Sequence, residues 1–315
     1  MQKQIEVVPY NSEWPVTFTR EAKLIKQALG NNCLEIHHVG STSVPNLAAK
    51  PKIDLIVVAK DAFLTHQPLA EIGFKYGGEY SIPMRHLFTK RGEIDFNLHL
   101  YEQNHPEIEL NLFFRDYLRT HEEVRQAYQQ LKYDILQAEF AHEKTNDSYR
   151  NYTLLKGDFI RAILKKTGIK RLRIFGCLHE VEWQAAKYFR GRYFFSAQSI
   201  DDPYTWTFNH PEHAHLILYQ GVDIIGYAHL QFWPKNRAAI RIIVVDENKR
   251  NTGMGSEFLA LIEKWLKSSG IKSIHAESRQ NSLQFYLKNG YQKMSFADPQ
   301  DHEIDTNDIA VGKVL

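Results

Sequence analysis

Cysteine is scarce in this sequence, and no motif pairs the two that occur. Cys33 and Cys177 lie far apart, and neither belongs to a C-x-x-C pair. This argues against a disulfide scaffold, and two lone thiols are typical of a reducing compartment. The first residues, MQKQIEVVPYNSEWP, contain no apolar segment and no small-residue cleavage site of a secretory signal. We therefore expect a cytoplasmic protein.

Long hydrophobic runs and an excess of one charge sign are also missing. No stretch of about 18 uncharged apolar residues occurs, so we expect no membrane span. Lysine and arginine total 39 and aspartate and glutamate 37, which gives a net charge of +2. An extended nucleic-acid surface normally shows as a basic excess and is not expected here. The 315 residues suit two domains of about 150 residues each.

Three common catalytic motifs are absent as well. His-Glu occurs at residues 121, 142, 179 and 302, but no second histidine completes H-E-x-x-H. No G-x-x-x-x-G-K-[ST] loop exists, and a dinucleotide-binding G-x-G-x-x-G would need glycine where Phe258 stands. These absences exclude a zinc protease of that type and the common loops for nucleoside triphosphates and dinucleotides.

The apolar patterns predict an α+β chain with two domains, residues 1–168 and 169–315. The boundary follows Lys165-Lys166-Thr167-Gly168, cations and then glycine at the end of a predicted helix. For the first domain they predict a helix over 13–29, strands over 34–39, 53–58, 86–89 and 94–100, and consecutive helices over 107–164, the last with Tyr149 and Ile163 on its apolar face. For the second they predict strands over 171–175, 214–219, 223–232, 238–246, 273–278, 291–296 and 309–314, and helices over 179–190, 254–268 and 282–289.

A glycine-rich turn at 250–255 is the most specific pattern in the chain. The strand predicted over 238–246 runs into this turn, and an amphipathic helix starts immediately after it. Glycines let the backbone approach a ligand, while the amides and positive dipole of a helix N-terminus favour an anion. The turn therefore predicts a site for phosphate or pyrophosphate.

The turn resembles the R/Q-x-x-G-x-G/A motif of the GNAT family of acyl-CoA-dependent N-acyltransferases, filled here by Arg250, Gly253 and Gly255. About 30 residues later, the segment 281–291 is similar to that family's N-x-x-x-x-F-Y-x-x-x-G-F/Y segment. The resemblance covers about residues 171–315. It implies a mixed, mostly antiparallel sheet flanked by helices, with acetyl-CoA as co-substrate and direct attack of an amine on the thioester.

The resemblance also implies site residues. Tyr286 corresponds to the residue that often protonates the departing CoA thiolate, which a phenol with a pKa near 10 can do close to the sulfur. The implied cofactor-binding residues are Ile243, Val244 and Val245 for the pantetheine arm, Arg250, Gly253, Met254, Gly255 and Ser256 for the pyrophosphate, and Asn281. A covalent intermediate on Cys177 is not expected, since this residue lies away from both motifs.

The general base stays open at this stage. In this family it is often a carboxylate acting through water, on or near the strand before the pyrophosphate loop. That strand offers Arg241 here, and no acid occurs before Asp246 and Glu247 at its end. Alternatives on neighbouring strands are Glu277, Ser278 and His229.

The acceptor is expected to be a small-molecule or peptide amine. Residues 298–308 contain five acids and no lysine or arginine just before the last strand. An acidic loop beside the site would attract a cationic amine. A solvated surface loop has the same composition, so a cationic acceptor is a hypothesis.

Residues 38–45, HVGSTSVP, followed by Ala48-Ala49-Lys50-Pro51 and Asp54, resemble the signature of the GrpB-like family, also called UPF0157. The segment 114–119, FRDYLR, also matches, and the resemblance spans about residues 4–165. It implies a nucleotidyltransferase-like fold, in which a Gly-Ser turn holds phosphates and carboxylates hold Mg²⁺.

Only part of that metal and phosphate set is present. Gly40, Ser41 and Lys50 are the candidate phosphate-binding residues, and Asp54 and Asp95 are the candidate Mg²⁺ ligands. Ile56 replaces the second carboxylate of the usual D-x-D pair. Nucleotide or phosphate binding is therefore favoured over nucleotidyl transfer. The histidines at 37, 38, 86 and 99 follow no zinc-binding spacing.

Three functions remain open for the whole chain. In the first, the second domain is an N-acyltransferase, and the first domain presents the acceptor or binds a phosphate-bearing ligand. In the second, both domains are enzymes that act on one metabolite. In the third, the chain binds CoA or nucleotides as a sensor without turnover.

Overall fold

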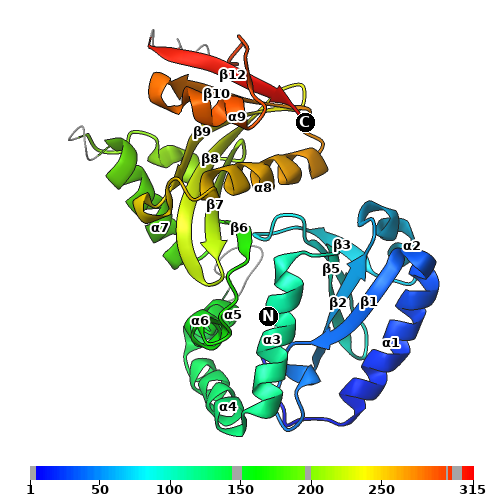
Figure 1. The fold of residues 1–315 in the computed structure, drawn as a ribbon. Coiled ribbons are helices and arrows are strands. Elements are labelled where there is room, and N and C mark those ends of the chain that lie inside the picture. Colours follow the sequence, from blue (N-terminus) through cyan, green and yellow to red (C-terminus); the bar gives the residue numbers. More distant parts are fainter. Residues whose placement is uncertain (1–4, 144–150, 196–199, 296, 300–306) are drawn as a thin grey trace. The chain divides into compact units, whose positions relative to one another are not determined.

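The computed structural model describes residues 5–143, 151–195, 200–295, 297–299 and 307–315. The chain forms two compact units: a first unit of residues 1–80 and 84–169, and a second unit of residues 81–83 and 170–315. Both combine helices with one sheet, which confirms the α+β prediction (Figure 1). Among the described helices, none is long and apolar enough to cross a membrane.

The first unit is built on a five-stranded sheet of order β1-β2-β5-β4-β3. Its strands are β1 (Cys33–Val39), β2 (Lys52–Ala59), β3 (Lys75–Gly78), β4 (His86–Lys90) and β5 (Asp95–Glu102). The neighbours β2 and β5 run parallel, and the other neighbours are antiparallel. The sequence predicted all of these strands except β3, which is an exposed edge strand.

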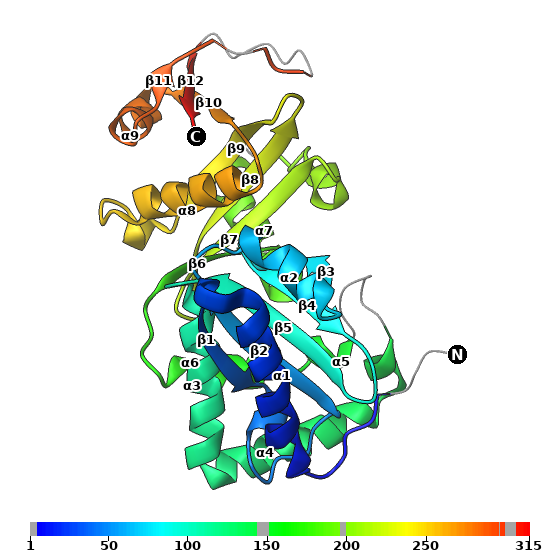
Figure 2. The same cartoon turned by 90° about the vertical axis from the view of Figure 1, so that its right-hand side faces the viewer.

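The two faces of this sheet have different roles. On β2, Ile53, Leu55 and Val57 point into an apolar core that includes Ile25 of α1 (Glu13–Leu29) and Leu69 of α2 (His66–Glu71). Because side chains alternate along a strand, Asp54 lies on the opposite face. Figures 1 and 2 show α1 on one face of the sheet and α3 (Pro106–Thr120) on the other. Asp54 therefore lies on the face of α3.

Three further helices follow α3 in the first unit. They are α4 (Glu122–Leu136), α5 (Asn151–Leu154) and α6 (Gly157–Lys165). The helix predicted through Ile163 is in fact broken after α5, so that Lys156 lies at the junction of α5 and α6; Tyr149 lies outside the described residues. The helix stop at Lys165 is confirmed, and Gly168 follows in the left-handed region with φ +68°.

The second unit contains a seven-stranded sheet of order β11-β12-β10-β9-β8-β7-β6. Its strands are β6 (Leu172–Gly176), β7 (His213–Gln220), β8 (Asp223–Trp233), β9 (Arg237–Val245), β10 (Ser273–Arg279), β11 (Gln292–Lys293) and β12 (Asp308–Val314). Among the described strands of this sheet, only β9 and β10 pair in parallel. The mixed, mostly antiparallel sheet is thus confirmed.

Helices cover both faces of this second sheet. Phe258 and Ile262 of α8 (Met254–Ser268) pack against Leu216 and Leu230 in one apolar core. Phe189 of α7 (Glu180–Arg190) packs in a separate core on Ile217, Tyr227 and Ile242. A short helix, α9 (Leu283–Lys288), follows β10. Residues 216 and 217 belong to different cores because adjacent positions of a strand face opposite sides.

Candidate functional site

In the second unit, β9 and β10 separate part of the way along their length. They are in parallel register only from Arg237 opposite Ser273 to Ile240 opposite Ala276. The next residue, Arg241, forms a β-bulge: His229 of β8 pairs with Ile242, and Leu230 pairs with Ile240. A bulge bends a strand and ends regular pairing on one side. Beyond it, the two strands no longer pair within the described sheet.

The separation exposes backbone groups of β9 to a ligand. Residues 243–245 still pair with β8 on one side, but they have no register partner on β10. Backbone amides and carbonyls there are available to hydrogen-bond an extended molecule. The predicted pantetheine-binding residues Ile243, Val244 and Val245 occupy this edge, and all three are half-buried.

The glycine turn lies at the end of the same strand. Gly253 has φ +88°, a left-handed conformation, and a Cβ built on it meets nothing within 4 Å. Gly255 differs, because a Cβ there would lie 3.2 Å from Cε2 of Phe285. One glycine is needed for backbone conformation and the other for close packing.

The start of α8 offers backbone amides. The amides of Ser256 and Glu257 donate to the carbonyl of Gly253, at 3.0 and 3.1 Å. The Met254 and Gly255 amides precede the first carbonyl that an α-helix could offer them. They are therefore the amides best placed for an anion at this helix end, whereas the predicted Ser256 amide already has a partner.

Aromatic and charged side chains pack around the turn. Arg250 is exposed, and its guanidinium carbon lies 4.8 Å from the centre of the Tyr193 ring. The Tyr193 hydroxyl accepts a hydrogen bond from the Glu247 amide at 3.2 Å, and Arg192 pairs with Glu247 at 2.6 Å. Sequence reasoning missed Tyr193, since no motif marks it.

Tyr286 lies on α9 in the same apolar core as Ile240 and Ala276, the last paired residues before β9 and β10 separate. Burial raises the pKa of the Tyr286 phenol, so the hydroxyl is protonated at neutral pH. In this protonated form Tyr286 can act as an acid but not as a base.

Asn281, also a predicted cofactor-binding residue, is exposed at the start of the same segment and accepts a hydrogen bond from Ser282 at 3.1 Å.

A polar group lies on the sheet face opposite α8, centred on Arg241. Its guanidinium donates to Oε1 of Gln231 at 2.8 Å and to Oδ2 of Asp298 at 2.5 Å. Its Nη1 lies 3.9 Å from Oε1 of Glu277, the first β10 residue beyond the parallel pairing. Asp298 is thus buried in an ion pair, and Asp301, Glu303 and Asp305 lie outside the described residues.

These contacts separate the candidate bases. Burial, with the nearby His215 and Arg190 charges, lowers the pKa of His229 to about 2, so this histidine is neutral at neutral pH and is a weak base. The Ser278 hydroxyl donates to the Arg279 carbonyl at 3.0 Å. Asp246 caps a short 3-10 turn by accepting the Asn248 amide at 2.9 Å. Glu277 is the carboxylate that lies where the strands separate.

In the first unit, Gly40 and Asp54 lie in contact. Gly40 has φ +70°, and a Cβ there would come within 2.5 Å of Oδ2 of Asp54. The other carboxylate oxygen accepts a hydrogen bond from Asn97 at 2.9 Å, and His99 lies 4.0 Å away. Burial acts to raise the pKa of Asp54, but His99 and Asn97 hold it below its usual value.

The structure does not join the two predicted metal ligands. On the parallel strands, Asp54 is in register with Asn97, whereas Asp95 is opposite Lys52 and lies 3.9 Å from Arg91. Mg²⁺ requires a compact set of oxygen ligands, and the group bonded to Asp54 is the amide of Asn97, not a second carboxylate. Nor does the described part of the chain contain a group of three acidic, histidine or cysteine side chains able to hold a metal. The Asp54–Asp95 pair therefore does not fit the predicted Mg²⁺ site.

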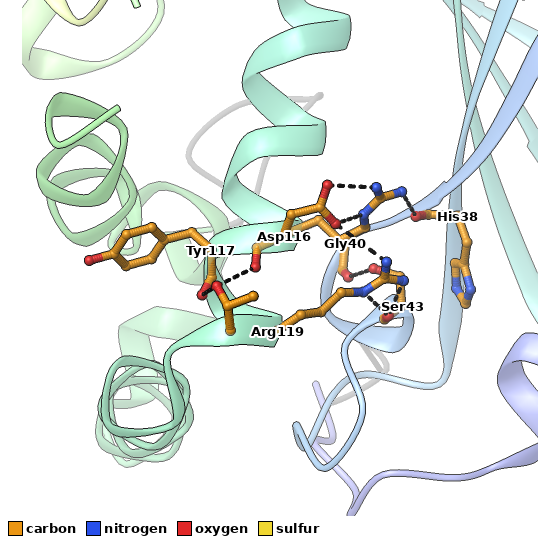
Figure 3. A network of polar contacts seen from close by, with 8 residues as sticks. His38, Gly40, Ser43, Asp116, Tyr117 and Arg119 are labelled. Atoms are coloured by element: carbon orange, nitrogen blue, oxygen red, sulfur yellow. Dashed lines mark hydrogen bonds and ion pairs between the residues drawn. The ribbon is translucent and has the colours of Figure 1, made fainter. Parts of the chain in front are cut away.

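Two arginines of α3 hold the loop that contains Gly40 and Ser41. Arg115 donates to the carbonyl of His38 at 3.1 Å, and Arg119 donates twice to the carbonyl of Ser43, at 2.8 and 3.1 Å (Figure 3). The Ser43 hydroxyl in turn donates to the Gly40 carbonyl at 2.6 Å. The matched segment 114–119 therefore fixes this loop in place.

Three lysines of this unit lie close enough to interact through their charges, and one of them, Lys132, contacts Ser41. Lys132 of α4 donates to the carbonyl of Ala48, and its ammonium lies 3.5 Å from Oγ of Ser41. Lys50 and Lys156 lie 4.7 and 4.4 Å from the centre of the Tyr152 ring. Only Lys50 was predicted. The available signal for Lys132 was its place on the apolar face of a helix, between Tyr128 and Ile135.

Two family models match the chain. One, described as GrpB protein, covers residues 4–166, and the other, described as Acetyltransferase (GNAT) family, covers residues 178–291. Both resemblances predicted from the sequence are confirmed. The nucleotidyltransferase-like character of the first unit stays a prediction.

Individual relatives match the first half. UPF0157 protein YqkA of Bacillus subtilis is 37% identical over 135 residues, which cover 42% of this chain and only 39% of YqkA. UPF0157 protein BH1888 of Halalkalibacterium halodurans is 34% identical over 165 residues, 51% of this chain and 82% of the relative. The crystal structure of GrpB from Enterococcus faecalis is 36% identical, covers 51% of this chain and 96% of its own, and gives a TM-score of 0.45.

Acetyltransferase structures match the second half. One is the crystal structure of an acetyltransferase of the GNAT family from Staphylococcus aureus Mu50, which is 14% identical. The match covers 46% of this chain and 99% of the other, with a TM-score of 0.38.

Proposed function

Because the chain belongs to the GrpB family over residues 4–166 and carries a GNAT acetyltransferase domain over residues 178–291, we propose that it transfers an acetyl group from acetyl-CoA to an amine. The separation of β9 from β10 after four paired positions carries this proposal. It leaves a strand edge that an acyl thioester arm can pair with, beside a helix N-terminus suited to a pyrophosphate.

The proposed contacts to acetyl-CoA are made by residues of β9 and of the turn that follows it. The backbone of Ile243 to Val245 hydrogen-bonds the pantetheine arm, and the Met254 and Gly255 amides hold the pyrophosphate. Arg250 lies exposed at the same turn and adds a positive charge. Ser256 and Asn281 complete the predicted set at the edge of this site. A helix N-terminus and a guanidinium together favour the two charges of a diphosphate.

The proposed chemistry uses one acid and one base. The amine attacks the thioester carbonyl, and the thiolate leaves as the tetrahedral intermediate collapses. Tyr286 protonates the thiolate, for which its buried, protonated phenol is suited. Glu277 takes the amine proton through a water molecule, since it is the carboxylate at the point where the strands part.

For the first unit we propose binding of a phosphate-bearing ligand at Gly40, Ser41 and Lys50. This ligand is the acceptor itself or a molecule that controls acetyl transfer. Nucleotidyl transfer is less favoured, because Ile56 replaces the second carboxylate of the D-x-D pair and the register neighbour of Asp54 is an amide, Asn97. The proposed compartment is the cytoplasm.

A turnover assay tests the acetyltransferase. The full chain is incubated with acetyl-CoA and a panel of primary amines, and released CoA thiol is followed by absorbance after reaction with a disulfide reagent. Acetylation of at least one amine, shown by mass spectrometry, supports the proposal. Tight binding of acetyl-CoA without turnover on any amine would instead favour the sensor function.

A pair of variants tests the base within this assay. Glu277→Gln is expected to lower kcat by about 100-fold, because general base catalysis contributes about that much or more. Glu180→Gln is the matched control, since Glu180 is exposed at the start of α7 and accepts a hydrogen bond from Gln184 of the same helix. Equal activity of the two variants would remove Glu277 from the mechanism.

A further inference from the structure

Lys132 and Lys156 place two ammonium groups close together in the first unit, with Ser41 beside Lys132 and with Asp54 near enough to act on Lys156. Lys132 is only 1% exposed, and its ammonium lies 3.5 Å from Oγ of Ser41. Lys156 is half-buried at the junction of α5 and α6. The two side chains come from separate segments of the chain. Their proximity therefore does not result from helical spacing along one segment.

Neither ammonium has a carboxylate partner within ion-pair distance in the described part of the chain. Burial lowers the pKa of Lys132 to about 7. Burial, and then repulsion from Lys50 and Lys132, lowers the pKa of Lys156 to about 7 as well, with Asp54 acting in the opposite direction. A buried ammonium without a counter-ion is costly, and such costs concentrate at sites where a ligand supplies the missing charge.

Contacts with neighbouring groups hold both lysine side chains in place in the unliganded chain. Lys132 also donates to the Ala48 carbonyl and lies 4.9 Å from the centre of the Tyr128 ring. Lys156 lies over the buried ring of Tyr152. The two rings limit where each ammonium can move, and Arg115 and Arg119 fix the loop that carries Ser41 (Figure 3). The site is therefore formed before a ligand arrives.

We infer that Lys132, Lys156 and Ser41 bind the dianionic phosphoryl group of a phosphorylated small molecule. Two ammonium groups match the two negative charges that a phosphate monoester carries at neutral pH, and charge-assisted hydrogen bonds to phosphate are strong. The Ser41 hydroxyl adds a donor. This inference rests on the phosphate-binding role proposed for the first unit, names its ligand class, and does not depend on acetyl transfer.

Calorimetry on the full chain tests the site. Inorganic phosphate, adenosine 5′-monophosphate and adenosine are titrated separately into the chain without acetyl-CoA, because acetyl-CoA carries a phosphate monoester of its own; the lysine variants then assign the binding to the first unit. Phosphate and the monophosphate are expected to bind, and adenosine is not. Tighter binding of the monophosphate would identify a nucleotide as the source of the phosphoryl group, and equal binding would identify the phosphoryl group alone.

Two variants and a control locate the binding. Lys132→Met and Lys156→Met are each expected to weaken phosphate binding about tenfold or more, the loss typical of one charge-assisted contact. Lys60→Met, an exposed lysine of the same unit, is expected to change nothing. Removing a buried charge favours folding, and unchanged hydrogen exchange of the β2 amides confirms that the first unit of each variant is intact.

The inference fails if the wild-type chain does not bind phosphate, or if both lysine variants bind it as the wild type does. The acetyltransferase proposal fails separately, if acetyl-CoA is not consumed with any amine. Phosphate binding without acetyl transfer would therefore keep this inference while rejecting the other.

Discussion

Gly40 and Asp54 are packed so closely that a methyl group on residue 40 would lie 2.5 Å from Oδ2 of Asp54. Gly40→Ala is therefore expected to destabilise the first unit by about 2–4 kcal/mol, because overpacking adds to the cost of a left-handed alanine. Hydrogen exchange of the β2 amides, measured by mass spectrometry, reports the stability of the first unit separately from that of the second.

Gly168→Ala is the matched control for Gly40→Ala. Gly168 has φ +68°, almost the φ of Gly40, and a Cβ there meets nothing within 4 Å. Gly168→Ala should lower the stability by only about 1 kcal/mol, because only the cost of the left-handed backbone applies. Equal losses in the two variants would show that contact with Asp54 has no effect on stability.

Gly253→Glu is expected to abolish acetyl-CoA binding, since it places a carboxylate where the diphosphate should lie. Gly270→Glu is the control at the other end of the same helix: Gly270 has φ +81°, Gly253 has φ +88°, and neither has an atom within 4 Å of a built Cβ. Both variants carry the same backbone strain. Calorimetry should show loss of affinity for the first alone, and similar affinity for both would reject the phosphate placement.

Tyr286→Phe removes the proposed acid while keeping the buried ring. We expect kcat to fall about 100-fold or more, with the KM for acetyl-CoA little changed, because only departure of the thiolate is affected. Tyr291→Phe is the control, since Tyr291 is also buried and its ring centre lies 5.2 Å from that of Tyr286. Comparable kcat values in the two variants would assign Tyr286 to packing alone.

Sulfate binding to the first unit should weaken as the pH rises through about 7. Sulfate keeps its charge over this range, so the change reports the protein. The lowered pKa values of Lys132 and Lys156, each about 7, mean that both lysines lose their protons there, and the neutral amines attract an anion less. Calorimetry between pH 6 and pH 9 checks this, and constant affinity would contradict it. The charged and titratable groups near the two ammoniums are Lys50, Asp54, Tyr128 and Tyr152.

The lowered pKa values of the two lysines have the opposite effect on the stability of the unliganded first unit, which should rise with pH. Both lysines have lower pKa values in the folded chain than the ordinary 10.5, so the folded state binds fewer protons than the unfolded state between about pH 7 and 10.5. Stability of the first unit should therefore rise with pH across this window, and the lysines oppose folding fully below pH 7. Bound anion should reduce this dependence.

The fold was predictable wherever apolar periodicity was strong. The strand around Leu55 and the helix around Ile262 are buried on one or both sides, and their patterns show it. The edge strand Lys75–Gly78 was missed because it is largely exposed and contains two glycines. The break at Lys156 was missed because apolar residues continue in helical spacing on both sides of it.

Site residues could be proposed from the sequence only where a local motif marks them. Gly253, Gly255 and Tyr286 belong to such motifs. Lys132 and Asn97 do not, because each acts through a residue far away in the sequence: Lys132 approaches Ser41, which is 91 positions earlier, and Asn97 bonds Asp54, 43 positions earlier. Contacts of this kind depend on strand register and helix packing, which one sequence does not specify.

Strand β12, residues Asp308–Val314, lies between β10 and β11 in the second sheet and pairs with both. Chains are synthesised from the amino terminus, so β10 emerges well before the strand that must cover its open edge. Until residue 314 has left the ribosome, that edge can pair with the wrong partner. The second sheet is therefore completed by the last of its strands to be made, and the second unit cannot finish folding before that strand has emerged.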